Sequence, residues 1–407
     1  MQGRTMLDLG LRNELLVLDL IRHAPDGTSQ SEVVRRTGLS RQTVSLIVRR
    51  LLDRGIISTA GTVTVGRGKP ATVLRLVPTA QLVAGVHLDP SAISLVIVDL
   101  LTSVVTERRL PAPSRDPEGD VDRIAAELTA VTQTLHEEGW RTPDGRDVDE
   151  ALLGIGVASP GPIDVTRGVI VDPPWLPGWR DMPVVKRLRA RTGLPVVLDK
   201  DTNAALTAEM WSTPQPTGET VLYLYIGAGI GSAVSVGGTV HHGAGALAGE
   251  IGHLPTGLEG AECSCGRRAC LSLYTDGAAL LERAEQLGVP LPDPDLPTVE
   301  RLAGLTSLAA DGDAGARQLV EDFGLALGEA LRTLIDVHDP HRVIIGGPNW
   351  AALEPVALGR VLERSRHARL RRPREVEILT SQRGDDVGAL GAATLFLQRE
   401  LSPAARG

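Results

Sequence analysis

The chain has 407 residues and a net charge of −8, with 42% hydrophobic and 23% charged residues, as in an ordinary globular protein. No run of about 18 consecutive apolar residues occurs, which excludes a membrane-spanning helix. The length predicts two or three domains, and because only 2% of residues are aromatic, the core must consist of Leu, Val, Ile and Ala.

The N-terminal 80 residues differ in charge from the rest of the chain. They hold twelve basic and six acidic side chains, a net charge of +6 that leaves −14 for the remainder. The first ten residues, MQGRTMLDLG, place polar and charged groups where the apolar core of a signal peptide would begin. We therefore expect a cytoplasmic protein in which a small basic module precedes an acidic body.

Apolar residues at helical spacing predict three helices in the basic module, within residues 7–24, 29–38 and 39–55. Their caps are expected at Ser29 or Ser31, Gly38, Ser40 and Gly55. Two helices joined by a tight turn, the second with Arg and Gln near its start, form a helix-turn-helix pattern. The side chains expected to face a DNA groove are Arg41, Gln42, Thr43 and Ser45. Those expected to face inward are Leu46, Ile47 and Leu51.

Two strand-like runs follow, on either side of Gly66-Arg67-Gly68-Lys69-Pro70. They predict a wing from which Arg67 and Lys69 contact phosphates or the minor groove. A small helical module for protein contacts is the alternative interpretation. Helix order, caps, wing and charge agree with one another, so we favour a winged helix-turn-helix that binds a double-stranded DNA operator.

From about residue 80 the pattern changes to alternating strands and helices. Strands are predicted within residues 82–100, 151–159, 194–201, 219–238 and 341–347. Helices are predicted within residues 123–139, 201–211, 276–288 and 315–339. This alternation indicates an α/β body.

All three cysteines of the chain lie within residues 263–270. Their number is odd, and a disulfide across Cys263-Ser264-Cys265 would close a short, strained ring. Zinc is the better explanation, because it prefers four thiolate and imidazole ligands. Unliganded thiols on a loop are the alternative, and such thiols are prone to oxidation.

The proposed ligands follow the pattern H-x9-C-x-C-x4-C, with Gly266 at a tight turn. They are His253, Cys263, Cys265 and Cys270. His241 and His242 are possible substitutes for the histidine. A set of three Cys and one His leaves no open position for water, so one structural Zn²⁺ per chain is predicted.

Three further stretches suggest a ligand site. Gly227, Gly229 and Gly231 are suited to a phosphate-binding loop, but a tight hairpin also favours glycine. Asp199 and Asp201 stand where a strand ends and a helix begins, and a carboxylate there can take a proton from a sugar hydroxyl or simply cap the helix.

Glu250 and His253 are three residues apart, so both can point at one ligand, and both side chains suit sugar hydroxyls. Trp175 and Trp179 stand in loops rich in Pro and Gly. A Trp ring can stack on a sugar, although such a residue is more often part of a core or an interface.

Together these stretches resemble the ROK family of repressors, open reading frames and sugar kinases. ASPGPID, WLPGW, DTNAA, GAGIG, GALAGEIGH, CSCGRRACL and VIIGGP occur in the family's order over nearly the whole chain. The N-terminal module looks like that of the family's regulator branch. The pairing of GEIGH with C-x-C-G-x3-C is the most specific part of this resemblance.

The resemblance implies a two-lobed, actin-like ATPase body of the ribonuclease H-like type. The expected domains are residues 1–78 for DNA binding, 79–200 plus 385–402 for the first lobe, and 201–384 for the second. In the family's kinases the position of Asp201 is the catalytic base, while those of Glu250 and His253 contact the sugar, His253 also binding zinc.

The chain departs from the kinase pattern at the first phosphate turn, Asp-x-Gly-Gly-Thr in kinases. Here His87 replaces the Asp, while Asp89 and Pro90 replace the glycines. Ala228 stands where a hydroxyl residue is usual in the second loop. These changes remove groups that act on one transition state, so we expect no catalytic residue, with Asp201 a vestigial base.

Lys200 replaces the Asn that usually precedes the base. Lysine has donors but no acceptor, which adds phosphorylated or acidic sugars to the expected effectors. We therefore expect a repressor, acting as a homodimer or homotetramer, whose sugar or sugar-phosphate effector binds at Lys200, Asp201, Glu250 and His253. The alternatives are an active hexose kinase with a DNA-binding domain, or a zinc-dependent redox or metal sensor.

Overall fold

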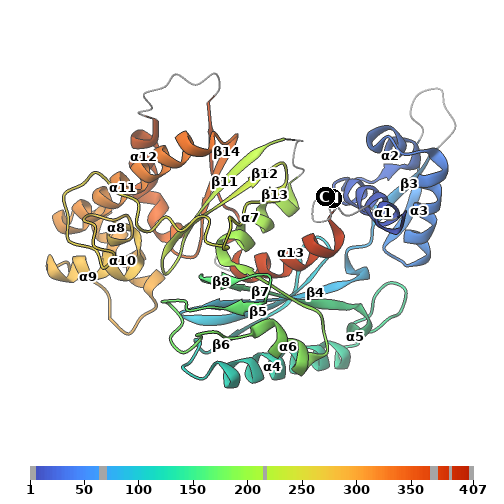
Figure 1. Cartoon of the computed structure of the whole chain (residues 1–407), viewed down its shortest axis with the longest axis horizontal. Coiled ribbons are helices and arrows are strands. Elements are labelled where there is room, and N and C mark those ends of the chain that lie inside the picture. The colour runs from blue at the N-terminus through green and yellow to red at the C-terminus, as the bar shows by residue number, and fades with distance from the viewer. Residues whose placement is uncertain (1–5, 64–70, 214–217, 367–374, 385–386, 403–407) are drawn as a thin grey trace.

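The computed structural model describes residues 6–63, 71–213, 218–366, 375–384 and 387–402. Figure 1 shows a small N-terminal domain beside a body of two lobes, each built on a five-stranded sheet. The predicted wing residues Arg67 and Lys69 lie outside the described residues. Within the described part of the chain, none of the helices combines the length and the apolar character needed to cross a membrane.

The N-terminal domain has three helices and a three-stranded antiparallel sheet in the order β1-β3-β2. Its elements are α1 (Met6–Arg22), β1 (Thr28–Ser29), α2 (Gln30–Thr37), α3 (Arg41–Asp53), β2 (Ile57–Val63) and β3 (Ala71–Leu76). Three predicted caps are confirmed: Ser29 and Ser40 each accept a hydrogen bond from a backbone N–H of their helix, and Gly38 ends α2 at a φ of 71°. At the end of α3 the C-cap is Arg54, and the predicted cap Gly55 follows it at a φ of 66°.

The first lobe contains a mixed sheet in the order β10-β7-β4-β5-β6. Its elements are the short 3₁₀ helix η1 (Pro78–Ala80), β4 (Leu82–Asp89), β5 (Ala92–Asp99), β6 (Val104–Leu110), α4 (Pro117–Glu137), α5 (Val148–Ala151), β7 (Leu152–Ser159), β8 (Ile163–Asp164), β9 (Val169–Ile170), α6 (Val184–Thr192), β10 (Val196–Lys200) and α13 (Val387–Leu401). Helices cover both faces, which explains why β4 and β5 are apolar along nearly their whole length.

The second lobe repeats this arrangement, with the sheet order β13-β12-β11-β14-β15. Its elements are α7 (Asp201–Ser212), β11 (Thr220–Ile226), β12 (Ile230–Val236), β13 (Thr239–Val240), α8 (Ser272–Thr275), α9 (Gly277–Gln286), α10 (Thr298–Asp311), α11 (Ala314–His338), β14 (Arg342–Gly346), α12 (Trp350–Arg366) and β15 (Glu377–Thr380). In both lobes the first three strands form an antiparallel meander, and the last two run parallel to the first.

Two helices, α7 and α13, lie between the sheets of the two lobes (Figure 1). α13 packs on β4 and β7, whereas α7 packs on β11 and β12. The two helices also pack closely on each other, since a Cβ added at Gly391 would lie 2.5 Å from the backbone of Ala204. The contact between the lobes is therefore made largely by this helix pair.

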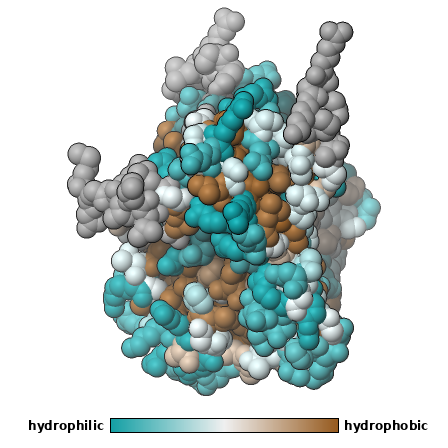
Figure 2. Space-filling model, turned by 90° about the vertical axis from the view of Figure 1, so that its right-hand side faces the viewer, coloured by the Kyte–Doolittle hydropathy of each residue, from teal (hydrophilic) through white to brown (hydrophobic). Residues whose placement is uncertain are grey.

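The N-terminal domain shares a hydrophobic core with the first lobe. One cluster of buried residues includes Ile21 and Leu51 of the domain together with Val98 and Phe396 of the lobe. Figure 2 shows the face of the molecule on this side, where hydrophobic residues reach the surface between hydrophilic ones. A pocket of about 320 Å³ lies at the junction, lined in part by residues of α1, α3 and α13.

Candidate functional site

The third helix of the N-terminal domain, α3, presents a polar face to solvent. Arg41, Gln42 and Ser45 are exposed and Thr43 is partly exposed. The Thr43 hydroxyl lies 2.8 Å from Oγ of Ser40, so part of its hydrogen-bonding capacity is used in the cap. The predicted DNA-facing residues thus share the first turns of one helix, and their contact with DNA stays a prediction.

One expectation for α3 is wrong, because Leu46 does not face inward. Its exposed fraction is 57%, whereas Ile47 and Leu51 are buried. The buried side of the helix is completed by Val44 and Val48, which share the helical spacing of the other two. Leu46 therefore lies on the solvent face, among the residues expected to face DNA.

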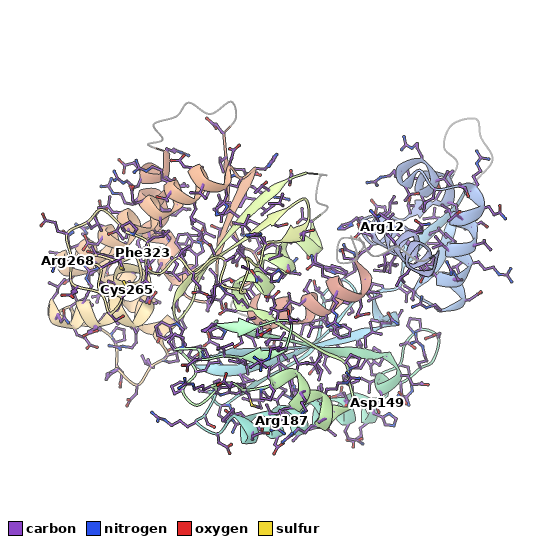
Figure 3. All side chains as sticks on the ribbon, in the orientation of Figure 1. Arg12, Asp149, Arg187, Cys265, Arg268 and Phe323 are labelled. Atoms are coloured by element: carbon purple, nitrogen blue, oxygen red, sulfur yellow. The ribbon has the colours of Figure 1, made fainter. Side chains whose placement is uncertain are left out.

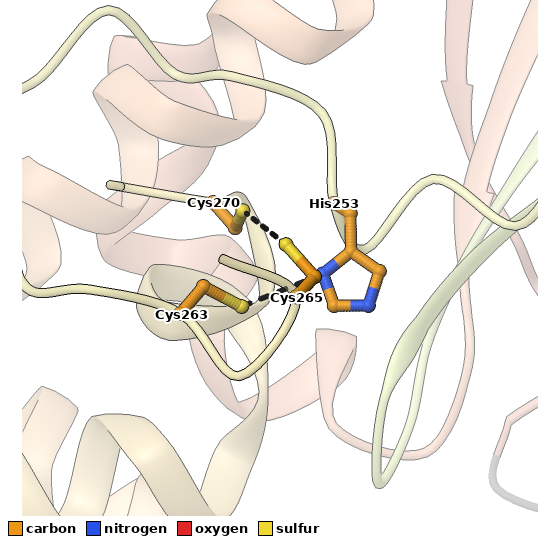
Figure 4. Close-up of side chains that lie close together, drawn as sticks. All are labelled: His253, Cys263, Cys265 and Cys270. Carbon is orange, nitrogen blue, oxygen red and sulfur yellow. Dashed lines mark hydrogen bonds between the residues drawn. The ribbon is translucent and has the colours of Figure 1, made fainter. Parts of the chain in front are cut away.

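The three cysteines and His253 come together as predicted (Figure 4). Their ligand atoms all lie within 4.8 Å of one another. Nδ1 of His253 is 3.5 Å from Sγ of Cys263, and Sγ of Cys265 is 3.6 Å from Sγ of Cys270. A zinc tetrahedron has edges of about 3.6–3.8 Å between such atoms, so this arrangement fits the ion.

The loop around the cysteines is held by its own backbone. Gly266 adopts a φ of 82° and donates its N–H to the carbonyl of Cys263 at 2.8 Å, which confirms the predicted turn. The guanidinium of Arg267 donates to the carbonyl of His253 at 3.1 Å. These contacts tie the segment that carries His253 to the cysteine turn.

A second group of predicted residues meets where β10 ends and α7 begins. Nζ of Lys200 lies 2.5 Å from Oε1 of Glu250 and donates to the carbonyl of Ala248 at 3.1 Å. The side chain of Lys200 is 2% exposed, whereas that of Glu250 is 52% exposed. Gly161, in the loop after β7, adjoins the pair, because a Cβ there would lie 3.1 Å from Oε1 of Glu250. Both lobes thus contribute to this site.

Asp201 is the first residue of α7 and lies beside Lys200. Burial raises the pKa of its carboxyl to about 7, against the lowering effects of Lys200 and of the Thr202 N–H, which donates to Oδ1 at 2.7 Å. Glu250 and Asp89 raise the pKa further. Asp201 is not the helix cap, since the N-cap position is Lys200. A carboxyl with this pKa can either donate to a ligand hydroxyl or accept from it.

His242 forms a contact that was not expected from the sequence. Its Nε2 lies 2.6 Å from Oδ2 of Asp199, and this hydrogen bond raises the pKa of the imidazole. Oδ1 of Asp199 accepts from the side-chain amide of Asn203 at 2.8 Å. His242 therefore pairs with the end of β10, and the histidine that joins the cysteines is His253.

Protein groups form hydrogen bonds within the two turns that correspond to the phosphate-binding turns of the family's kinases. In the β4–β5 turn, Oδ1 of Asp89 accepts from the backbone N–H and the hydroxyl of Ser91, at 2.8 and 2.5 Å. In the β11–β12 turn, the N–H of Gly227 donates to the carbonyl of Gly229 at 3.0 Å. The indole of Trp175 also packs there, since a Cβ added at Gly229 would lie 3.1 Å from its Nε1.

The two tryptophans in the Pro-Gly loops have different environments. Trp179 is fully buried in the core of the first lobe, which agrees with the structural interpretation of this residue. Trp175 is 38% exposed and contacts the glycine turn of the second lobe. Trp175 is therefore a contact between the lobes.

Two family models match the chain. The model of the ROK family matches residues 85–399, and that of the MarR family matches residues 7–68. The first match spans most of the two-lobed body, and the second spans the three helices and strand β2 of the N-terminal domain. Both matches agree with the expected fold, an actin-like body preceded by a winged helix.

Repressors and sugar kinases are both among the similar proteins. The xylose repressor of Bacillus subtilis is 24% identical over 395 residues, which cover 96% of each chain. The glucokinase of Halalkalibacterium halodurans is 31% identical over 272 residues, covering 62% of this chain and 78% of the enzyme. A solved ROK family transcriptional regulator, a homologue of the E. coli MLC protein, has a TM-score of 0.77 at 20% identity over 98% of both chains.

Proposed function

The chain belongs to the ROK family, and from this premise we propose that it is a DNA-binding transcriptional repressor whose kinase-like body binds a sugar. The observation that carries the proposal is the presence, in one chain, of an exposed polar helix face on a winged helix and a ligand site between two lobes. The xylose repressor of Bacillus subtilis extends over the same two parts.

The DNA-binding part is assigned to residues 1–78, the first lobe to residues 79–200 with 385–402, and the second to residues 201–384. A single winged helix buries little DNA surface, and domains of this type generally bind palindromic sites in pairs. The functional form is therefore a homodimer or homotetramer on double-stranded DNA.

The effector is a sugar held by Lys200, Asp201, Glu250 and His253. The charge of Lys200 is already matched by Glu250 at 2.5 Å, and Asp89 and Asp201 add further carboxyl groups nearby. A sugar phosphate would have to bring its charge into this acidic surrounding. The pairing therefore favours an uncharged sugar, whose hydroxyls can bond to both members of the ion pair.

One structural Zn²⁺ is the metal that fits His253, Cys263, Cys265 and Cys270. The four ligands fill its tetrahedron, so the ion would hold the loop and take no part in chemistry. With Nδ1 directed at the cysteines, Nε2 of His253 is left to contact a sugar hydroxyl. The metal would thus fix the direction of a sugar-binding side chain.

We propose that the chain does not act as a kinase. Asp89 is bonded within the turn where kinases bind phosphate and magnesium, and Trp175 packs on the second glycine turn. The competing function is a hexose kinase, which the glucokinase relative and the near-neutral pKa of Asp201 favour. The two functions differ in whether MgATP matters to the ligand response.

Thermal unfolding of the full chain separates these possibilities. The panel contains D-xylose, D-glucose, N-acetylmannosamine and their phosphates, each with and without MgATP. A ligand that binds only the folded protein raises the midpoint. A rise with one neutral sugar that MgATP does not change supports the repressor. A rise that requires sugar and MgATP together supports the kinase, and no rise with any sugar contradicts both.

A further inference from the structure

Helix α7 connects the proposed sugar site to the DNA-binding domain. Asp201 is its first residue and Trp211 lies in its last turn. With a rise of 1.5 Å per residue, these two residues are about 15 Å apart along the helix axis. Most of α7 between them is buried against α13 and the second sheet. A close-packed helix of this kind transmits a displacement of one end to the other.

The last turn of α7 is fastened to the N-terminal domain. The guanidinium of Arg22, at the end of α1, stacks 3.7 Å from the centre of the Trp211 ring and also donates to the Trp211 carbonyl. Asp19 holds the guanidinium from the other side at 2.6 Å. Nε1 of Trp211 donates to the carbonyl of Leu100 at 3.1 Å. Trp211 is thus bonded to both the domain and the first lobe.

The first turn of α7 is fastened to the second lobe by contacts that a sugar would change. Lys200 and Asp199, which precede the helix, pair with Glu250 and His242 of the loop after β13. A sugar that bonds to Lys200, Asp201 and Glu250 must compete with the Lys200–Glu250 pair. Occupancy of the site therefore alters the forces on the start of the helix.

We propose that Arg22 and Trp211 are positioning residues that make the orientation of the DNA-binding domain depend on the sugar site. This inference rests on the proposed function. The sugar favours one position of α7 over another, and the Arg22–Trp211 contact passes that preference to α1 and so to α3. Coupling of this kind requires only that the sugar binds the two positions with different affinity. Figure 3 shows Cys265 of the cysteine turn and Arg12 of α1 on opposite sides of the molecule.

The test compares DNA affinity with and without sugar in wild type, Trp211→Leu and Arg22→Gln. The DNA probe is the duplex that the wild-type protein selects from a random pool, and the sugar is D-xylose or D-glucose, whichever raises the melting temperature. We expect sugar to change the DNA affinity of wild type by tenfold or more and that of both variants by less than twofold. The sugar affinity of both variants should stay within threefold of wild type. Arg146→Gln is the matched control, because Arg146 bonds to the carbonyl of Ala80 at the same junction but is not part of α7.

Reciprocity provides an independent readout, since DNA must change sugar affinity by the same factor as sugar changes DNA affinity. Trp211→Phe keeps an aromatic face and should retain most of the coupling. If Trp211→Leu fails to fold, the comparison of Trp211→Phe with Arg22→Gln replaces it. The inference would be overturned if Arg22→Gln and Trp211→Leu bind sugar and keep the wild-type ratio of DNA affinity with sugar to DNA affinity without sugar. If neither sugar changes the DNA affinity of wild type, the proposed function fails and the coupling fails with it.

A second, independent observation concerns base recognition by α3. Leu46 is 57% exposed, and its neighbours one turn away on the helix surface are Gln42, Arg49 and Arg50, all exposed. A large apolar side chain on this face contributes nothing to the core. Apolar side chains on a recognition helix can contact the C5-methyl group of thymine. We infer that Leu46 is a specificity-determining residue that reads a thymine.

Uracil substitution tests this inference, because it removes only the methyl group. Each thymine of the selected duplex is replaced in turn, and wild type and Leu46→Ala are compared by fluorescence anisotropy. Wild type should lose about threefold or more in affinity at one or two positions, and the variant should show no further loss there. An equal loss in the variant, or no sensitive position in wild type, would overturn the inference. Failure to select any duplex would instead contradict the proposed function.

Discussion

Replacing Asp201 by Asn should stabilise the protein without ligand at pH 8 and leave its stability unchanged near pH 4. Burial raises the pKa of Asp201 from 3.8 to about 7 in the folded protein. The pKa of Asp201 is higher in the folded protein than in the unfolded chain. The contribution of the Asp201 carboxyl to the stability of the folded protein is therefore complete below pH 4 and is lost as the pH rises through 7. The shift corresponds to at most ~4 kcal/mol. Asp201 is partly exposed, so we expect about 1–2 kcal/mol.

The substitution isolates the charge, because the Asn oxygen can still accept from the Thr202 N–H. Urea unfolding followed by tryptophan fluorescence at pH 4 and pH 8 measures the difference in stability between wild type and variant. A variant that is less stable than wild type at pH 8, or a difference that does not depend on pH, would refute the assignment of a carboxyl with a raised pKa at Asp201.

Sugar affinity should also depend on the titration of Asp201, but it should rise with pH where the stability of the ligand-free protein falls. If the ionised carboxylate accepts from a sugar hydroxyl, the competent fraction rises roughly tenfold between pH 6 and pH 8 for a pKa of about 7. Calorimetry should therefore show tighter binding at the higher pH in wild type, and weak, pH-independent binding in Asp201→Asn. Tighter binding at pH 6 would mean that the protonated acid is the group that contacts the sugar.

Three further outcomes are expected. Cys265→Ser should lose zinc and the sugar-induced rise in melting temperature together, as measured by metal analysis and thermal unfolding; a variant without zinc that keeps the sugar response would separate the two. Arg41→Ala should weaken binding to the selected duplex by about tenfold, the cost of one base or phosphate contact, and an unchanged footprint would remove Arg41 from the DNA face. Wild type should form no ADP from MgATP with D-glucose or D-xylose in a coupled assay, whereas sustained turnover would establish the kinase function.

Local signals were sufficient to predict both ends of α2 and the start of α3. The helices α6, α10, α12 and α13 were not predicted. Ser29, Ser40 and Gly38 act within a few residues of themselves, so the sequence contains all that decides them. The cysteine cluster was also predictable, because three of its four ligands lie within eight residues and thiolate chemistry limits the options. The family motifs then placed Lys200, Asp201 and Glu250 near one another.

The contacts that give the site its present charge were not predictable. The pairs Lys200–Glu250 and Asp199–His242 join segments more than 40 residues apart, and no local pattern indicates them. The prediction for Leu46 was wrong because an apolar residue in an amphipathic helix is expected to face the core. In α3 the buried face is already occupied by Val44, Ile47, Val48 and Leu51. The stacking of Arg22 on Trp211 joins residues 189 positions apart, and no local pattern indicates it.

The shared core of the N-terminal domain and the first lobe limits how this chain can be re-engineered. A biosensor designer who exchanged the N-terminal domain for that of another regulator would leave Val98 and Phe396 without the side chains that now cover them. The foreign domain would also lack the arginine that stacks on Trp211. A working chimera therefore needs the α1 residues that contact the first lobe to be kept when the recognition helix is exchanged. The contact between the domain and the first lobe is then preserved while the operator changes.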